Sequence, residues 1–106
     1  MNQKKMDNAY FHFQEAIRIR PNYSSVYNNL GMALEINNRE EEALIQYLNS
    51  LKCKDPCPEA HYNLGMAMLR KNKFNEAIYY FQEALKINKQ MAESYLGLGL
   101  TYQLQG

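Results

Sequence analysis

The sequence contains no tryptophan, and among its 106 residues there are only five glycines, three prolines and two cysteines. Glycine, proline and the β-branched residues are all scarce, which argues for an all-helical chain rather than a β-sheet protein. The two cysteines, Cys53 and Cys57, are too few for a disulfide-stapled scaffold and are consistent with a reducing compartment.

Long hydrophobic runs and an excess of one charge are also missing. No stretch approaches the roughly 20 apolar residues of a membrane span, and the N-terminal "MNQKKMDNAY" lacks the apolar segment of a secretory signal. Twelve Lys and Arg residues nearly balance eleven Asp and Glu residues, so no strong field favours nucleic acid or an anionic membrane. The sequence therefore predicts one small, soluble, cytoplasmic domain.

The chain does contain a period of 34 residues. Leu-Gly pairs recur at this constant step, as Leu30-Gly31, Leu64-Gly65 and Leu98-Gly99. The same step relates three alanines, each followed four residues later by an aromatic residue: Ala9 with Phe13, Ala43 with Tyr47, and Ala77 with Phe81. Small and large residues in one register indicate helices that pack closely, so we expect the glycines where two helices approach each other.

Each period holds two stretches with helical apolar spacing, separated by a short polar break such as "NNRE". A break of this length reverses the chain, so each unit is predicted to be an antiparallel helix pair. The expected helices cover residues 5–20, 24–37, 40–53, 58–71, 74–88 and 92–104.

This pattern resembles the tetratricopeptide repeat, W-x2-L-G-x2-Y, then A-x3-F, then P over 34 residues. Tyr27, His61 and Tyr95 stand in the tryptophan position, and the closing proline is Pro21, then Pro56 displaced by one, then Lys89. The resemblance implies an all-α solenoid of six antiparallel helices in a right-handed superhelix. Its parts would be a half repeat (5–23, second helix), full repeats 24–57 and 58–91, and a half repeat (92–106, first helix).

Candidate chemistry is sparse. Cys53, Cys57 and His61 lie at four-residue steps, but prolines interrupt a helix there and structural zinc normally takes four ligands. Cys53 and His61 also occupy repeat positions held elsewhere by packing residues, so we expect core or loop roles. No nucleophile with a base and no glycine-rich phosphate loop is recognisable. We therefore expect a non-enzymatic protein without metal or cofactor.

The resemblance places the partner-binding surface on the concave face made by the first helix of each pair, where an extended peptide or a partner helix binds. Gly97 also falls on this lining. The predicted groove residues are Asn28, Asn29, Met32, Glu35, Glu59, Tyr62, Asn63, Met66, Arg70, Leu96 and Leu100.

Asn29 and Asn63 lie one period apart and are predicted to begin an asparagine ladder. A side-chain amide offers a donor and an acceptor, so it can pair with a peptide unit whatever the peptide's side chains. This is similar to the concave ladder of O-linked N-acetylglucosamine transferases. A clamp for acidic chaperone tails is disfavoured, because its cations are absent and Glu59 and Glu93 would repel such a tail.

Two alternatives remain open at this point. The chain opens with a second helix and closes with a first helix, so it could act as an assembly or folding module through these unmatched ends, by head-to-tail stacking or swapping. The residues expected to self-associate are Leu98, Leu100, Tyr102 and Leu104. Alternatively, the chain is a substrate-recruiting fragment of a larger enzyme. The leading hypothesis is a protein-interaction scaffold that binds protein or peptide, and neither nucleic acid nor membrane.

Overall fold

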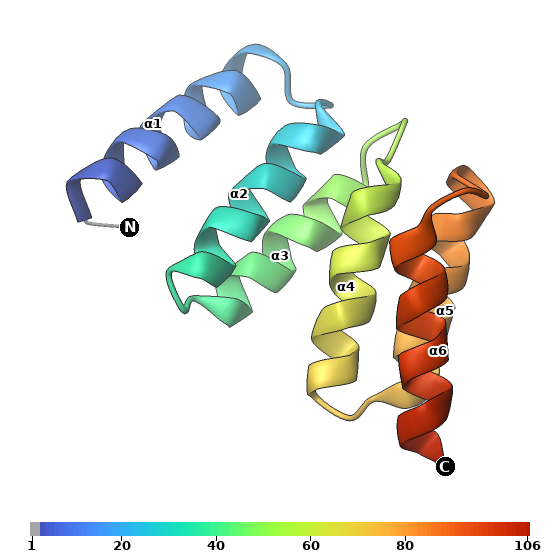
Figure 1. Ribbon diagram of the computed structural model, residues 1–106. Helices are drawn as coiled ribbons and strands as arrows, with labels where there is room; N and C mark the ends of the chain where they lie inside the picture. The colour runs from blue at the N-terminus through green and yellow to red at the C-terminus, as the bar shows by residue number, and fades with distance from the viewer. Residues whose placement is uncertain (1–2) are drawn as a thin grey trace. The chain divides into compact units, whose positions relative to one another are not determined.

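The computed structural model describes residues 3–106, and the regular structure in this range is entirely α-helical. The helices are α1 (Gln3–Ile19), α2 (Ser24–Ile36), α3 (Glu40–Leu51), α4 (Pro58–Arg70), α5 (Phe74–Ile87) and α6 (Ala92–Gln105), as Figure 1 shows. The predicted all-α fold is confirmed, and each predicted helix lies within two residues of the observed bounds.

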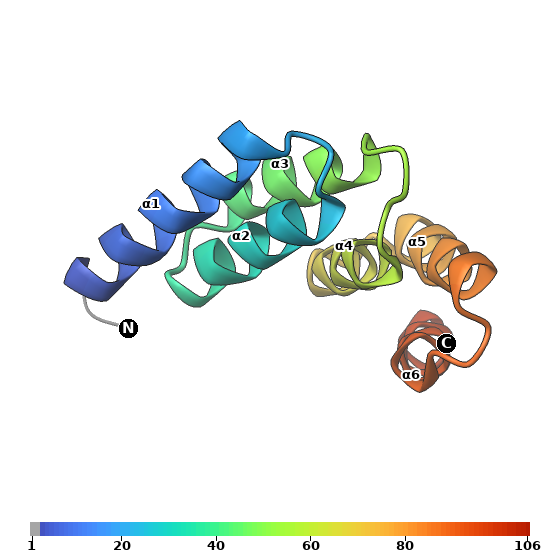
Figure 2. The ribbon, with the colours of Figure 1, turned by 90° about the horizontal axis from the view of Figure 1, so that it is seen from above.

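The chain divides into two compact units, Met1–Pro56 and Cys57–Gly106. Unit 1 contains α1, α2 and α3, and unit 2 contains α4, α5 and α6. In unit 1, α2 packs against α1 and α3; in unit 2, α5 packs against both α4 and α6, which Figure 2 shows from above. The site is described within each unit by itself.

The two helix pairs α2–α3 and α4–α5 turn in the same way, at asparagines one period apart. Asn38 has φ 61° and Asn72 has φ 60°, in the left-handed region that asparagine tolerates better than other residues with a side chain. After each turn a backbone N–H reaches back into the preceding helix, with Arg39 donating to the Leu34 carbonyl at 2.8 Å. These turns end α2 and α4 and reverse the chain.

Unit 1 is held together by an aromatic ring packed on a glycine. Tyr47 of α3 is fully buried, and a Cβ placed on Gly31 of α2 would lie 2.6 Å from its ring. The Tyr47 hydroxyl donates a hydrogen bond to the Glu35 carboxylate, which satisfies a polar group that burial would otherwise leave unpaired. One end of the helix pair is joined by the Ser50 hydroxyl, which donates to the Ser24 carbonyl at 2.9 Å.

Unit 2 repeats this packing, with a second glycine close to the same ring. Phe81 of α5 is fully buried, and a Cβ on Gly65 of α4 would lie 2.7 Å from it. A Cβ on Gly97 of α6 would lie 2.5 Å from the same ring. Because both neighbours lack side chains, three helices approach one aromatic ring closely.

The prediction of close helix approach is confirmed at Gly31 and Gly65 but is wrong at Gly99. A Cβ built on Gly99 would meet nothing within 4 Å. The physical reason is that α2 and α4 are each covered by the helix that follows them, whereas within the described residues no helix lies on this side of α6. The glycine of α6 that makes the close approach is Gly97, two residues earlier.

His61 lies in the core of unit 2, as expected from its repeat position, and is 9% exposed. Its Nδ1 is buried without a well-formed hydrogen bond. Burial lowers the pKa of His61, while the Cys57 backbone and the Glu83 carboxylate partly oppose this shift. The neutral imidazole is therefore the form that the fold favours.

We predict that alanine at the covered glycines destabilises the protein, although alanine ordinarily favours helices. Gly65→Ala should lower the free energy of unfolding by about 1–3 kcal/mol, because the new methyl group overlaps the confined Phe81 ring. Gly99→Ala, the matched control on an open surface, should raise it by up to about 1 kcal/mol. Urea unfolding followed by circular dichroism measures both changes, and equal effects of the two substitutions would contradict this account of the core.

We also predict that stability falls as the pH drops below the ordinary His61 pKa of 6.5. In this range the unfolded chain takes up a proton that the folded state resists, so the free energy of unfolding declines until the pH passes the lowered folded-state value. Urea midpoints measured between about pH 7.5 and about pH 5.5 should show this decline in the wild type and a smaller one in His61→Gln.

His12→Gln is the control, because His12 is exposed on α1 and its loss should leave the decline intact. The interpretation fails if His61→Gln retains the full wild-type pH dependence.

Candidate functional site

In unit 1 the exposed part of the predicted surface is Asn29 and Met32 of α2. Together with Ile36, an exposed residue on the same helix, they form a strip that we call the α2 face. Asn29 is exposed, and the two apolar side chains are 43% and 64% exposed. Asn28, also predicted as a groove residue, is buried at 5% exposure, and its amide donates to the Met32 sulfur at 3.7 Å. The α2 face therefore combines one amide with two accessible apolar groups.

Unit 2 carries the equivalent surface on two neighbouring helices. We define the α4–α6 face as Tyr62 and Met66 of α4 with Leu96 and Leu100 of α6. The two helices contact each other and run in the same direction, so residues one period apart lie at matching heights (Figure 1). Leu96 is 64% and Leu100 is 37% exposed. Tyr62 and Met66 are half-buried and pack on the core around Phe81.

The polar residues predicted for unit 2 differ in accessibility. Glu59 and Arg70 are exposed near the two ends of α4, while Asn63 is half-buried between them. Gly97, which the resemblance placed on the lining of the groove, is instead buried against Phe81 and presents no surface there. The α6 position equivalent to the two asparagines thus serves packing, because only a residue without a side chain fits against that ring.

Sequence reasoning missed a structural role for Glu35. It was predicted as a groove residue, but its carboxylate accepts the hydrogen bond from Tyr47 and is half-buried. A signal was available, because a tyrosine at a core position needs a partner for its hydroxyl. The turn asparagines Asn38 and Asn72 were also missed, although their spacing repeats the period.

Two hollows of unit 1 are small. One of about 240 Å³ is lined by Pro21, Asn22, Tyr27, Asn49, Lys52 and Cys53. Another of about 190 Å³ is lined by Tyr10, Gln14, Leu30, Leu34, Arg39, Glu42 and Gln46. Both lie below the roughly 300–1,000 Å³ of typical small-molecule sites. The extended helix faces are therefore better candidates for recognition than either hollow.

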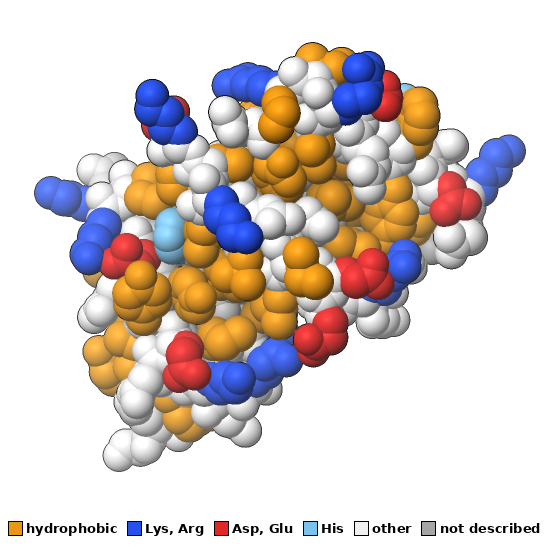
Figure 3. All heavy atoms as spheres, turned by 180° about the vertical axis from the view of Figure 1, so that it is seen from behind, with side chains coloured by type: hydrophobic (Ala, Val, Ile, Leu, Met, Phe, Trp, Pro, Cys, Tyr) orange, Lys and Arg blue, Asp and Glu red, His pale blue; other side chains and the backbone are white. Residues whose placement is uncertain are grey.

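Several charged side chains pair with a residue close to them in the sequence. Arg18 with Glu15 and Arg39 with Glu42 form ion pairs at 3.1 and 2.9 Å. The hydrogen bond and charge of Glu15 raise the pKa of Arg18 further above its ordinary value. On the face seen in Figure 3, positive and negative side chains alternate around exposed hydrophobic ones. This distribution offers no basic stripe on that face for a nucleic-acid backbone.

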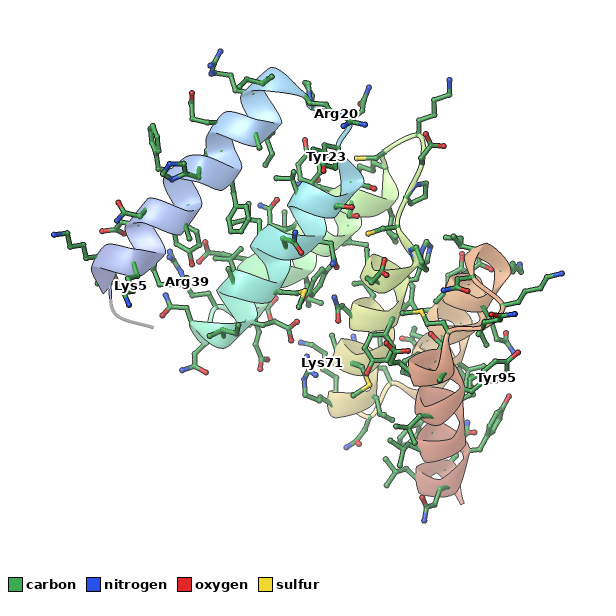
Figure 4. All side chains as sticks on the ribbon, turned by 45° about the horizontal axis from the view of Figure 1, so that its top comes forward. Lys5, Arg20, Tyr23, Arg39, Lys71 and Tyr95 are labelled. Atoms are coloured by element: carbon green, nitrogen blue, oxygen red, sulfur yellow. The ribbon has the colours of Figure 1, made fainter. Side chains whose placement is uncertain are left out.

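Aromatic rings also engage nearby cations. The Arg20 guanidinium lies 4.3 Å from the centre of the Tyr23 ring at the α1–α2 connection, and Figure 4 shows the two side chains together. Arg39 approaches the Tyr10 ring at 5.8 Å. Such contacts stabilise an arginine locally and reduce its availability to an anionic ligand.

Metal chemistry has little support in the part of the chain that the structure describes. Within residues 3–106, no group of three or more His, Cys, Asp or Glu residues is placed to hold a metal ion. Cys53 is buried and Cys57 is half-buried, and neither forms a disulfide bond. None of the helices between residues 3 and 106 has the length and apolar character needed to cross a membrane.

Comparison with known proteins agrees with this geometry. Two family models described as Tetratricopeptide repeat match residues 58–91 and 12–45, and these separate matches together span more than half of the chain. The crystal structure of MamA is similar to this chain with a TM-score of 0.79 and 24% sequence identity. The match covers 98% of this chain and 61% of the MamA chain, and at this identity it concerns the fold.

No curated protein matches the chain. The repeat period, the helix pairs and the two family matches lead to one conclusion. The chain belongs to the tetratricopeptide repeat family and is a protein-interaction repeat module.

Proposed function

We propose that the chain binds an extended segment of a partner protein on the first-helix surfaces of its repeats, namely the α2 face and the α4–α6 face. The observation that carries this proposal is the exposure of apolar side chains beside side-chain amides. Met32 and Leu96 are 43% and 64% exposed on helices that pack against another helix of their own unit. Large contiguous patches of exposed apolar side chains often mark an interaction site.

The amides supply the polar part of the proposed recognition. Asn29 on α2 and Asn63 on α4 occupy equivalent positions of two repeats. Each amide can donate to a peptide carbonyl and accept from a peptide N–H, so it recognises backbone and not a particular side chain. An extended segment suits this mode, because its peptide groups are not already used in a helix.

The apolar side chains supply contact area. Met32 and Met66 are unbranched and flexible, so they adapt to side chains of different shape. Leu96 and Leu100 provide a firmer apolar surface on α6. This combination favours a partner segment that carries apolar side chains.

We predict that Asn29→Ala weakens binding without weakening the fold. Peptides selected from a random display library on the wild-type chain would be labelled and titrated by fluorescence anisotropy. Loss of one peptide hydrogen bond should reduce the affinity by about tenfold, corresponding to roughly 1–1.5 kcal/mol. The melting temperature should not change, because Asn29 is exposed.

Asn8→Ala is the matched control, since Asn8 is an exposed helical asparagine on α1, a helix that contributes no residue to either face. Its affinity should equal that of the wild type. Unchanged affinity of Asn29→Ala for every selected peptide would remove the asparagine from the proposed contact. Peptides that instead lose affinity only on substitution at the small hollows would overturn the proposed surface.

A further inference from the structure

One side of α6 is open where the equivalent side of α2 and α4 is covered. We call it the Gly99 face and define it as Tyr95, Gly99 and Tyr102. Tyr95 is 57% exposed and projects from α6 (Figure 4), whereas His61 at the equivalent position of α4 is 9% exposed. Tyr102 is 54% exposed, whereas Leu34 at the equivalent position of α2 is 4% exposed. The Gly99 face therefore has the glycine of the repeat packing but lacks the aromatic ring.

α1 carries the aromatic residue of the repeat packing, but its side chain is not fully covered. We call its open side the Phe13 face and define it as Ala9, Phe13 and Ala16. These residues occupy the positions that are fully buried in α3 and α5, where Tyr47 and Phe81 pack on their glycines. On α1 all three are only half-buried. The Phe13 face therefore has the aromatic ring but lacks the glycine.

We propose that the Phe13 face of one copy of this chain docks on the Gly99 face of another copy. The contact would repeat, between two molecules, the packing that joins α4 to α5 and α2 to α3 within each unit. The ring of Phe13 would lie on Gly99, as Tyr47 lies on Gly31 and Phe81 on Gly65. A second copy is the favoured occupant because the chain itself carries the complementary residues in the complementary register.

The register of the contact follows from a hydrogen bond inside unit 1. There the Ser50 hydroxyl donates to the Ser24 carbonyl at 2.9 Å and aligns α3 antiparallel to α2. Ala16 lies one period before Ser50, and Ala92 lies two periods after Ser24. The same alignment between two copies therefore places Ala16 of the docking copy beside Ala92 of the receiving copy. Both are alanines, so the helices can approach closely at this end as well.

One part of the charge distribution favours this alignment. Within Ala92–Gln105 the single charged side chain is Glu93, in the first turn. The Arg18–Glu15 ion pair comes to the same end as Glu93 and adds no net charge there. Lys4 and Lys5, near the start of α1, come to the C-terminal end of α6, where the helix dipole favours cations.

The proposed interface is heterologous, because two different surfaces of the chain meet. Such contacts continue from copy to copy or close into a ring. One helix-on-helix contact falls in the small, weak class of interfaces, so we expect association to depend on protein concentration. The proposed peptide-binding surface uses other residues, Asn29 among them, and the two proposals can fail independently.

Sedimentation equilibrium of the purified chain tests the proposal, at concentrations from about 10 μM to about 1 mM. The weight-average mass should rise with concentration. Gly99→Ala should weaken association by about tenfold or more, because its methyl group occupies the space of the Phe13 ring. The same substitution should not lower the urea midpoint of the monomer, since nothing lies within 4 Å of this position.

Two further variants distinguish this interface from non-specific association. Phe13→Tyr should associate like the wild type, because tyrosine fills the equivalent position at Tyr47. Ile45→Ser removes a side chain that is 56% exposed on α3 and should also leave association unchanged.

A mixture of Gly99→Ala with Phe13→Ala provides the most specific result. Each variant has one intact face, so the mixture should form a heterodimer that neither variant forms alone as a homodimer. A wild-type chain that remains monomeric at about 1 mM would overturn the proposal. Association that Gly99→Ala leaves unchanged would overturn it as well, since another surface would then be responsible.

Discussion

The packing of a buried aromatic ring against a glycine on the facing helix is the contact on which the rest of the structure depends. Tyr47 lies on Gly31, and Phe81 lies between Gly65 and Gly97. A side chain on any of these glycines would separate the helices and expose the apolar residues beside them. A buried tyrosine in this position also needs a hydrogen-bond partner, and Glu35 accepts the hydrogen bond from the hydroxyl of Tyr47.

This contact also determines where the accessible surfaces fall. α2 and α4 each give one row of positions to the ring of the helix that follows in the same unit. Met32 lies on another side of α2 and is exposed for that reason. Gly97 is the exception, because Phe81 reaches across to α6 and takes the position that carries an asparagine in the other two first helices.

Much of the fold was predictable because the residues that repeat every 34 positions are the small and large side chains that pack between helices. The helices, the close approach at Gly31 and Gly65 and the core position of His61 follow from repeat spacing. The predictions that failed depend on which helices pack around a residue more than on local secondary structure. Gly99 stands at the glycine position of the repeat, but no described residue packs against it. Asn28 lies on the helix predicted to line the groove, but it is buried. The asparagine contact remains a prediction, since peptide recognition depends on a partner as well as on this chain.

The amino-acid sequence by itself determined the helices, their antiparallel pairing and their membership of a repeat, because these depend on local spacing and on the size of residues 34 positions apart. Only the tertiary structure decided which repeat-equivalent residues are covered. Phe13 and Phe81 are the same residue type at equivalent positions, yet one is half-buried and the other is fully buried. The physical reason is that burial is a property of the helices packed around a residue, and the repeat pattern carries no record of whether such a helix is present.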